Sequence, residues 1–403
     1  MGHFALDSVP VSQYFWPEEF RINDLALDLV KKGHDVSVIT GNPNYPQGKF
    51  NKGYGFKYSK EVFKGIKIYR VPVSPRGKNS LMLVINYLSF VLFGSFFSFF
   101  HRVKYDKVFA VNYSPITAVL PGLVYSRKNK LELSIWVQDL WPESIVASSN
   151  IKSKIIFDVL NKLVKYIYQN CENIFISNSG FKNSIIEKKI SSDKIKFMPN
   201  WAEDIFESSG TLNANREELN IPEGFVVMFA GNIGESQDFE SIIKAIELTQ
   251  SNSSIQWVFV GSGRKSKWLH GTIEEKKLTN VVTLLGRHPT ESMPDFFKFA
   301  DVMLVSLKNE YIFSITVPGK VQSYMASSKP ILTMLNGDGS NIIKESKSGF
   351  VANAGDYKTL SMNVQKCFNL SSIELQELGQ NGLKYYQKYY SKDKIVEFFL
   401  NEI

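Results

Sequence analysis

Short runs of apolar residues alternate with amphipathic segments along most of the chain after residue 12. Residues 22–30 carry apolar side chains at the three- and four-residue spacing of a helix, which Gly33 can end. Trp16–Glu19 looks like the start of that helix, because proline and acidic residues favour a first turn. The apolar runs that follow are short and continuous, as in buried strands. Strands are expected at Asp35–Thr40, Ile66–Val71, Val108–Asn112, Leu131–Val137, Ile174–Ser177 and Ile195–Met198.

The second half repeats this rhythm, with a helix expected at Phe239–Leu248. Continuous apolar strands alternating with helices indicate parallel sheets that helices cover on both faces. The sequence therefore predicts an α/β protein of two Rossmann-like, doubly wound parallel-sheet domains that face a central cleft. In the second domain, strands are expected at Phe225–Ala230, Ile255–Val260, Val281–Leu285, Val302–Leu307 and Pro330–Met334.

The length of 403 residues also favours more than one domain, at roughly 150 residues each. We place the boundary near Pro199–Trp201. Residues 1–200, with a C-terminal helix at about 385–403 packing back on them, would form the first domain. Residues 201–384 would form the second.

The stretch Met1–Val11 does not fit the pattern. It lacks the basic start and continuous apolar core of a signal peptide. Asp7, Ser8 and Pro10 interrupt what would be the first strand, so a poor strand is expected here. A natural segment and a remnant of cloning are both compatible with this stretch.

The segment Leu81–Phe100 contains no charged residue, and Arg76, Lys78, Arg102 and Lys104 flank it. Its length suffices to span a bilayer. It is expected to lie between two strands of one sheet, however, and a spanning helix would separate them. Three interpretations stay open: a helix in the membrane interface with the basic flanks of 81–104 on anionic headgroups, a buried core helix, and a transmembrane span.

Composition narrows the classes of function. The apolar fraction of 44% excludes a disordered chain. The formal charge of +8 suits phosphorylated ligands or an anionic membrane, and without an arginine-rich arm or zinc-finger spacing we expect no nucleic acid partner. Two cysteines, Cys171 and Cys367, exclude a disulfide framework and indicate a reducing cytosol. The five histidines form no metal-binding motif.

Candidate ligand contacts lie just after the strands, because ligands of open parallel sheets bind beyond the carboxyl ends. Glycine turns there let backbone N–H groups approach a phosphate, although the same turns also serve plain strand–helix connections. Neither turn completes a dinucleotide fingerprint, and no Walker sequence occurs, so hydride transfer and ATP hydrolysis are poorly supported. The residues concerned are Gly231, Asn232 and Gly234 after one strand, and Gly261, Gly263, Arg264 and Lys265 after the next.

The segment Thr316–Lys320 is more distinctive, because Pro318 and Gly319 can begin the amphipathic helix Val321–Ala326. Lys320 could then place its ammonium beside a pyrophosphate. An ordinary helix entrance with a solvated lysine is the alternative.

In the first half, Asp139 follows an apolar strand, where a carboxylate can contact a substrate hydroxyl. A helix N-cap is its structural alternative, since Pro142 follows closely. Glu18, Glu19 and Arg21 occupy the equivalent place after the doubtful first strand. Paired acids in a first helical turn are usually solvated partners of the helix dipole.

From about Ser12 to its end, the chain resembles glycosyltransferase family 4, whose enzymes have the GT-B fold. The closest pattern is the bacterial surface-polysaccharide branch that includes the L-fucosamine (N-acetylfucosamine) transferases. Asp139–Ser144 and Val317–Lys320 are the specific segments. The others are Gln13–Glu18, Pro199–Trp201 and Tyr324–Ala326.

The resemblance implies a retaining glycosyltransferase of the hexosyltransferase type that uses a UDP-sugar and needs no metal or other cofactor. The donor would bind the second domain, with the 231–234 turn and Lys320 at the diphosphate and Arg287 near the nucleoside. The acceptor would bind the first domain, with Asp139 near the reacting centre. Residues expected on the acceptor side are Glu18, Arg21, Trp141 and Glu143.

The sequence departs from the family pattern at several positions. Ile315 and Ser323 stand where two glutamates are usual, and Gln138 replaces a common histidine and cannot act as a general base. The usual lysine after the first glycine turn of the second domain is absent, and Ser236–Asp238 occupy that neighbourhood. Lys320 and Arg264 become the candidates for the missing positive charge.

Three hypotheses follow. The leading one is transfer of a deoxy-amino sugar, N-acetyl-L-fucosamine or a relative, from UDP to a polyprenyl-diphosphate-linked glycan in O-antigen or capsule synthesis. The enzyme would be cytoplasmic and peripherally associated with the bacterial inner membrane. A UDP-sugar 2-epimerase of the same fold and a non-catalytic sugar-nucleotide-binding subunit are the alternatives.

Overall fold

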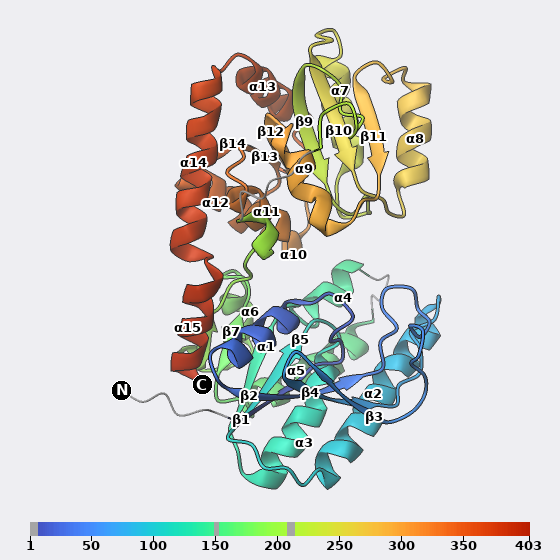
Figure 1. The fold of residues 1–403 in the computed structure, drawn as a ribbon, viewed down its shortest axis with the longest axis vertical. Helices are drawn as coiled ribbons and strands as arrows, with labels where there is room; N and C mark the ends of the chain where they lie inside the picture. The colour runs from blue at the N-terminus through green and yellow to red at the C-terminus, as the bar shows by residue number, and fades with distance from the viewer. Residues whose placement is uncertain (1–6, 149–152, 208–213) are drawn as a thin grey trace. The chain divides into compact units, whose positions relative to one another are not determined.

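The structure is a computed structural model that describes residues 7–148, 153–207 and 214–403. The chain forms two compact units, Met1–Pro199 with Ile395–Ile403, and Asn200–Lys394 (Figure 1). The division falls next to the expected boundary. The C-terminal return begins at Ile395, later than expected, because the region from 385 onward is split between two helices, α14 (Ser372–Tyr389) and α15 (Lys392–Glu402).

The described part of the first unit contains an eight-stranded sheet in the order β3-β4-β2-β1-β5-β6-β7-β8. All neighbours pair in parallel except β3 and β4, which form an antiparallel hairpin. The strand order reverses between β1 and β5, which makes their carboxyl ends the expected ligand edge. The strands are β1 (Asp7–Val11), β2 (Asp35–Gly41), β3 (Ser59–Phe63), β4 (Ile66–Val71), β5 (Lys107–Asn112), β6 (Leu133–Val137), β7 (Ile174–Ile176) and β8 (Ile195–Phe197).

Helices cover both faces of this sheet (Figure 1). Besides α15, the first unit has α1 (Arg21–Lys31), α2 (Ser80–Phe100), α3 (Leu120–Asn129), α4 (Glu143–Ser148), α5 (Lys154–Gln169), α6 (Phe181–Glu187) and short 3-10 turns at Ile116–Val119 and Ser192–Lys194.

The described part of the second unit has six parallel strands in the order β11-β10-β9-β12-β13-β14, which reverses between β9 and β12. The strands are β9 (Phe225–Ala230), β10 (Ile255–Val260), β11 (Val282–Gly286), β12 (Val302–Ser306), β13 (Ile331–Met334) and β14 (Gly349–Ala352). The helices besides α14 are α7 (Phe239–Thr249), α8 (Ser266–Glu275), α9 (Met293–Lys298), α10 (Tyr311–Ser314), α11 (Gly319–Ala326), α12 (Asp338–Ser346) and α13 (Tyr357–Phe368), with 3-10 turns at Asp204–Phe206 and Thr290–Ser292.

The second sheet is buried on both faces. In β9, Val226 and Met228 join one hydrophobic cluster, whereas Val227 and Phe229 join the cluster on the opposite face. Successive side chains of a strand point to opposite faces, so a strand covered on both sides is apolar at every position. This explains the continuous apolar runs in the sequence and confirms the predicted doubly wound architecture.

The expectation of a poor first strand was wrong. Asp7–Val11 forms β1, which lies at the centre of the sheet and pairs with both β2 and β5. Pro10 is tolerated there even though proline cannot donate to a ladder, and Val9 and Val11 are fully buried. Tertiary burial thus outweighs weak local propensity. Residues 1–6 lie outside the described part of the chain.

Other boundaries also differ from expectation. Residues 16–19 are not the start of α1, which begins at Arg21 after Phe20 in an extended conformation. Two strands were not predicted: β3, which is half-exposed and carries Lys60 and Glu61, and β14, which has four residues at a sheet edge. Short edge strands bury little apolar surface and leave little pattern in the sequence.

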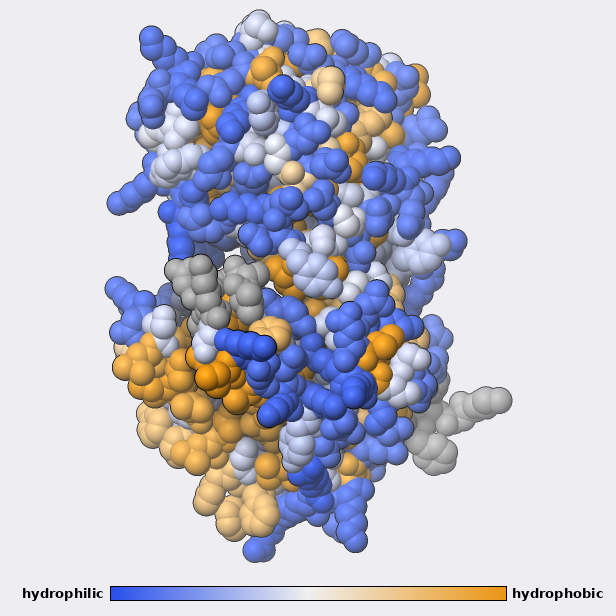
Figure 2. Space-filling view, turned by 180° about the vertical axis from the view of Figure 1, so that it is seen from behind, coloured by the Kyte–Doolittle hydropathy of each residue, from blue (hydrophilic) through white to orange (hydrophobic). Residues whose placement is uncertain are grey.

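Helix α2 has an inverted distribution of polarity. Its buried residues are Asn86, Phe90, Gly94 and Ser98, which share one face at four-residue spacing. Gly94 lets the helix approach α3, because a Cβ there would lie 2.8 Å from Cγ of Pro121. The large apolar side chains point outward instead, as Figure 2 shows in orange, and they include Leu81, Leu88, Leu92, Phe96, Phe99 and Phe100. The buried-core interpretation of this segment was therefore wrong.

The return of the chain to the first unit is anchored by aromatic packing from α15. Phe399 is 1% exposed, and its ring centroid lies 4.7 Å from that of Phe109 and 5.4 Å from that of Phe175. Phe398 is half-buried and reaches Phe175 at 6.3 Å.

We predict that Phe399→Ala destabilises the first unit by about 3–5 kcal/mol, because it removes a fully buried aromatic ring and leaves a cavity. Chemical denaturation followed by tryptophan fluorescence would measure the loss. Phe398→Ala serves as the matched control with a smaller effect. Equal losses from both variants would contradict the anchoring role of Phe399.

Candidate functional site

Two glycine turns pack together at the carboxyl edge of the second sheet. The turn 231–234 follows β9 and the turn 261–263 follows β10, and backbone hydrogen bonds join them, from Gly231 N to Val260 O (2.8 Å) and from Ile233 N to Ser262 O (3.0 Å). Gly261 N in turn donates to Gly286 O at the end of β11 (2.6 Å). The ends of three neighbouring strands therefore form one continuous backbone surface beside the β9–β12 reversal.

This close packing requires glycine. Gly231 and Gly261 have φ of 135° and 143°, values that side chains disfavour. A Cβ on Gly261 would lie 1.8 Å from Gly231 O, and one on Gly263 would lie 2.6 Å from Oδ1 of Asn232. The turns therefore expose backbone where side chains would otherwise stand, as a phosphate cradle requires.

Lys320 lies against this backbone surface. It is the second residue of α11, and a Cβ on Gly231 would lie 2.6 Å from its Cε and 3.2 Å from its Nζ. The ammonium donates to Oε1 of Gln237 (3.0 Å) and stands 4.3 Å from the ring centroid of Phe229. Among the described residues it has no carboxylate partner. Gly231 and Lys320, distant in sequence, thus form one site. Gln237, which accepts from Lys320, lies in the segment Ser236–Asp238 that stands where a lysine was expected.

Burial lowers the pKa of Lys320 from 10.5 to about 7. An amide oxygen and an aromatic face offset the desolvation of the ammonium only in part. An anionic group placed beside Nζ would stabilise its charged form. A buried lysine with a lowered pKa, next to the two glycine turns, is therefore a candidate anion-binding group.

The other predicted donor-side residues surround this cradle. Pro318 and Gly319 begin α11, and Arg264 and Arg287 are exposed on the loops after β10 and β11. Neither arginine is paired with a carboxylate in the part of the chain that the structure describes. Lys265, by contrast, is neutralised by Glu240 (2.6 Å) and Glu235 (3.5 Å).

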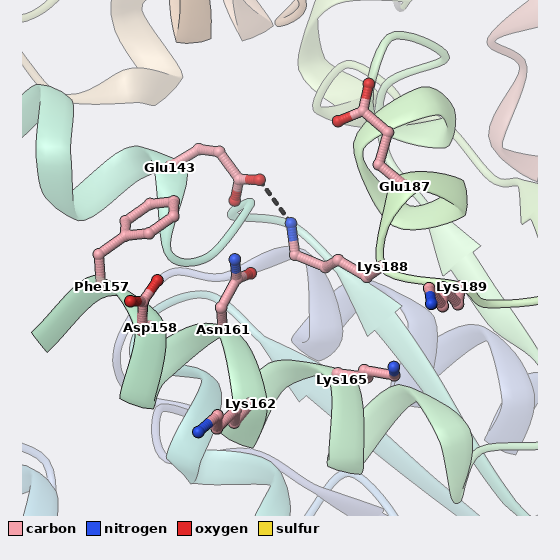
Figure 3. Close-up of a pocket in the computed structure, with 9 residues that line it drawn as sticks. All are labelled: Glu143, Phe157, Asp158, Asn161, Lys162, Lys165, Glu187, Lys188 and Lys189. Carbon is pink, nitrogen blue, oxygen red and sulfur yellow. Dashed lines mark hydrogen bonds and ion pairs between the residues drawn. The ribbon is translucent and has the colours of Figure 1, made fainter. Parts of the chain in front are cut away.

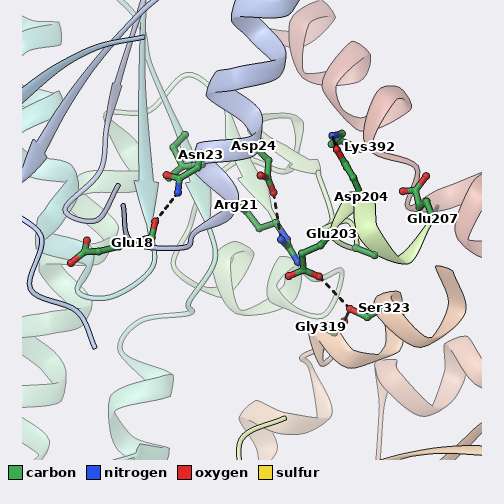
Figure 4. A network of polar contacts seen from close by, with 12 residues as sticks. Glu18, Arg21, Asn23, Asp24, Glu203, Asp204, Glu207, Gly319, Ser323 and Lys392 are labelled. Carbon is green, nitrogen blue, oxygen red and sulfur yellow. Dashed lines mark hydrogen bonds and ion pairs between the residues drawn. The ribbon is translucent and has the colours of Figure 1, made fainter. Parts of the chain in front are cut away.

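Ser323, which stands where the resemblance leads us to expect a glutamate, has a carboxylate beside it from another part of the unit. Its Oγ donates to Oε2 of Glu203 (3.5 Å) and to Gly319 O (3.3 Å) (Figure 4). The sequence pattern did not reveal Glu203, because it lies in the segment that opens the second unit, more than a hundred positions from Ser323.

In the first unit, Asp139 follows β6 at the carboxyl edge. Its backbone carbonyl accepts from Nδ2 of Asn112 (2.8 Å), and its carboxylate accepts from Nε1 of Trp141 (3.2 Å). Burial raises the pKa of this carboxyl above its ordinary value, although hydrogen bonds with Ser144, Trp141 and Ser114 act to lower it. Asp139 caps no helix in the structure, because α4 begins only at Glu143. The N-cap alternative is therefore wrong.

Glu18 is buried and not solvated as paired acids of a first helical turn would be. Its Oε1 accepts from the backbone N–H groups of Asn44 and Tyr45, both at 2.7 Å. Burial raises its pKa to about 7. The carboxylate satisfies two donors of the loop after β2, which would otherwise be unpaired. Its main-chain oxygen accepts from Asn23 (Figure 4).

Two other residues predicted on the acceptor side, Arg21 and Glu143, each form an ion pair with a different partner. Arg21, the first residue of α1, forms an ion pair with Asp24 (3.5 Å). Glu143 forms a largely buried ion pair with Lys188 (2.6 Å) and accepts from Ser184. It lines a cavity of about 570 Å³ with residues of α5 and α6 (Figure 3). The Glu143 carboxylate is thus held by Lys188, whereas that of Asp139 accepts from Trp141, and burial together with both negative charges raises the pKa of Tyr168.

Metal binding has no candidate among residues 7–148, 153–207 and 214–403, which contain no group of three or more His, Cys, Asp or Glu side chains placed to hold an ion. Positive charge at the edge of the second sheet comes from lysine and arginine.

The comparisons with known proteins fit this geometry. Residues 213–385 match the family described as "Glycosyl transferases group 1". Over 310 residues the chain is 24% identical to WcaI of Escherichia coli (strain K12), named as a colanic acid biosynthesis glycosyl transferase, with 74% of each chain covered. Over 277 residues it is 27% identical to WbjE of Pseudomonas aeruginosa, named as a glycosyltransferase, covering 65% and 66% of the two chains.

Solved structures show the same fold. Sucrose-phosphate synthase of Thermosynechococcus elongatus superposes with a TM-score of 0.73 at 14% identity, over 98% of both chains. Anabaena HepE, solved with UDP and glucose, superposes with a TM-score of 0.67 at 14% identity, also over 98% of both chains. The fold is GT-B, as predicted.

The depressed pKa of Lys320 predicts how stability depends on pH. Between pH 7 and 10.5 the unfolded chain holds a proton on this lysine that the folded chain lacks, so this group makes the fold more stable as pH rises. Lys320→Met should therefore stabilise the protein most at or below pH 7, on the order of 2 kcal/mol, and little near pH 10. Denaturation of both proteins at pH 6 and pH 9.5 tests this. A gain that is the same at both pH values would contradict a desolvated ammonium.

Proposed function

We propose that this chain, a glycosyltransferase of the GT-B type whose residues 213–385 match the group 1 glycosyltransferase family, moves a sugar from UDP to a lipid-linked glycan at a membrane surface. The proposed donor sugar is N-acetyl-L-fucosamine or a related deoxy-amino sugar, transferred with retention during bacterial O-antigen or capsule synthesis. Support for the sugar comes from the segments Asp139–Ser144 and Val317–Lys320, and support for the pathway class from the relative named for colanic acid.

The donor half of the proposal is supported by the cradle of the second unit. The glycine turns carry no side chain where Lys320 packs against Gly231, so the bare backbone leaves a diphosphate room to approach the ammonium. The neighbour HepE was solved with UDP at the same fold. A UDP leaving group gains negative charge as the glycosidic bond breaks, and fixed donors in a desolvated site stabilise that charge without a metal.

Lys320 suits this role because, without a bound anion, burial disfavours the charged form of its ammonium. With a pKa of about 7 it is only partly charged before the diphosphate arrives, and the anion restores the full charge. Charge complementarity is then strongest when the departing diphosphate is most negative, as transition-state stabilisation requires.

The acceptor half is supported by Asp139. Its raised pKa and its place at the carboxyl edge suit a carboxylate that accepts a hydrogen bond from an acceptor hydroxyl. Trp141 holds the carboxylate in position through its Nε1. Asp139 thereby orients and partly deprotonates the attacking hydroxyl.

The single observation that supports a lipid-linked acceptor is helix α2, whose large apolar side chains are exposed. It is long and apolar enough to cross a membrane, yet only 17% of its apolar window is buried. Exposed apolar patches of this kind mark membrane or protein contacts. Arg102 and Lys104 follow the helix, and Lys128 lies 5.9 Å from the ring centroid of Phe99, so cations border the patch. Apolar side chains with a basic border suit the interface of an anionic membrane.

The transfer assay tests the activity. With UDP-N-acetyl-L-fucosamine and a polyprenyl-diphosphate-linked saccharide, we expect UDP release that depends on the acceptor. Lys320→Ala should weaken UDP binding about 10- to 100-fold by calorimetry, because it removes a charge-assisted contact to the diphosphate. Asp139→Asn should lower turnover at least tenfold and leave UDP affinity unchanged.

The controls separate the alternatives. Conversion of the UDP-sugar without acceptor would indicate an epimerase. A folded protein that binds UDP but releases none with a broad panel of UDP-sugars and lipid-linked acceptors would refute the proposed transfer.

Membrane binding has its own test. Leu88→Gln, Leu92→Gln and Phe96→Gln together should abolish flotation with vesicles that contain anionic lipid, because these exposed side chains supply apolar surface to the membrane and little packing to the fold. UDP affinity should not change. The matched control replaces exposed apolar residues elsewhere, Leu248→Gln with Met362→Gln in the second unit. Flotation that survives the triple substitution would contradict a membrane contact by α2.

A further inference from the structure

Arg76 carries a positive charge for which the described residues supply no carboxylate partner. Its guanidinium lies 5.1 Å from the ring centroid of Tyr45 and 5.9 Å from that of Tyr14, and Nη1 donates to Oη of Tyr14 (3.0 Å). In the described part of the chain it has no carboxylate partner, and its Nε and Nη2 have no hydrogen-bond acceptor. The side chain is half-buried. A cation in such a place normally has an anion beside it.

The guanidinium is held in place. The backbone N–H of Arg76 donates to Oδ1 of Asn44 (2.9 Å), and Asn44 N donates to the buried carboxylate of Glu18 (2.7 Å). Tyr14 is 3% exposed and stacks on Phe20 at 5.1 Å. The fork of Arg76 is thus oriented before any ligand binds, which lowers the entropy lost on binding an oxyanion.

The location connects the membrane helix with the reacting carboxylate. Arg76 lies in the loop that leads directly into α2. From Tyr14, a row of polar groups continues through the hydroxyl of Tyr87, within hydrogen-bonding reach of Tyr14 and Ser114, to Nε1 of Trp141, which donates to both Ser114 and Asp139. A polar row of this kind suits saccharide hydroxyls. It begins at a guanidinium beside the apolar helix and ends at Asp139.

We propose that Arg76 binds the phosphate group through which the acceptor glycan is joined to its lipid. This inference rests on the proposed function and names the acceptor subsite: lipid along α2, phosphate at Arg76, and sugar hydroxyls along Tyr87 and Ser114 toward Asp139. Guanidinium presents two parallel N–H donors to phosphate oxygens, a geometry that a lysine ammonium does not match.

Binding of farnesyl diphosphate and of farnesol, measured by calorimetry with excess UDP to fill the donor cradle, tests the subsite. The wild-type protein should bind the diphosphate at least tenfold more tightly than the alcohol. Arg76→Ala should lower affinity for the diphosphate about 10- to 100-fold and leave farnesol binding unchanged. Arg76→Lys should recover part of the loss, since the charge returns without the fork.

Lys78→Ala is the matched control, because Lys78 is an exposed cation in the same loop, and it should change affinity less than threefold. Arg76→Lys retains the charge and bulk of the stem, so it decides the question if Arg76→Ala does not fold. Equal affinity of the wild type and both Arg76 variants for the diphosphate would overturn the proposal, and so would equal binding of diphosphate and alcohol by the wild type. Because this assay needs no turnover, a failed transfer reaction would refute the proposed function and leave the phosphate subsite standing.

Discussion

The burial of two parallel sheets on both faces is the constraint from which the rest of the molecule follows. A strand covered on both sides has no exposed position for a polar side chain, so chemistry moves to the loops beyond the carboxyl ends. In both units the strand order reverses beside the first strand, and the polar residues of interest follow β9, β10 and β12 in one unit and β1, β4 and β6 in the other. Strands therefore supply the buried apolar core, and the loops that follow them supply the polar side chains.

Within each unit, desolvation shifts the pKa values of the ionisable side chains that the loops hold. Lys320 is pressed against the backbone of Gly231 with an amide and an aromatic ring as its partners, and its pKa falls to about 7. In the first unit, burial acts in the opposite direction on acids and raises the pKa of Glu18 to about 7. Glu18 serves the loop that carries Asn44, and through Asn44 it supports Arg76. A buried acid that at first resembles a catalytic group is therefore better understood as a support for a neighbouring cation.

Helix α2 shows a second consequence of burial. The buried face of α2 carries Asn86, Gly94 and Ser98 beside a single phenylalanine, Phe90, whereas most of the leucines and phenylalanines of the helix are exposed, which is the reverse of a soluble helix. Such a helix costs solubility unless a membrane or another apolar surface covers it. Because α2 directly follows the loop that carries Arg76, the proposed membrane contact and the proposed phosphate subsite are neighbours along the chain.

Local pattern was enough to predict the two doubly wound sheets, most of their strands and the positions of the glycine turns, because continuous apolar runs and strand-end glycines are properties of short segments. It also singled out Lys320 and Asp139 as candidates, and their roles stay predictions. It was insufficient for β1, whose Pro10 and Asp7 argue against a strand until two neighbours pair with it. It was insufficient also for Glu18, Arg76, Gln237 and Glu203, whose settings arise from partners far away in sequence. Only the tertiary structure brings Lys320 against Gly231 and Arg76 between Tyr14 and Tyr45, because desolvation and charge pairing depend on distance in space and leave no periodicity along the chain.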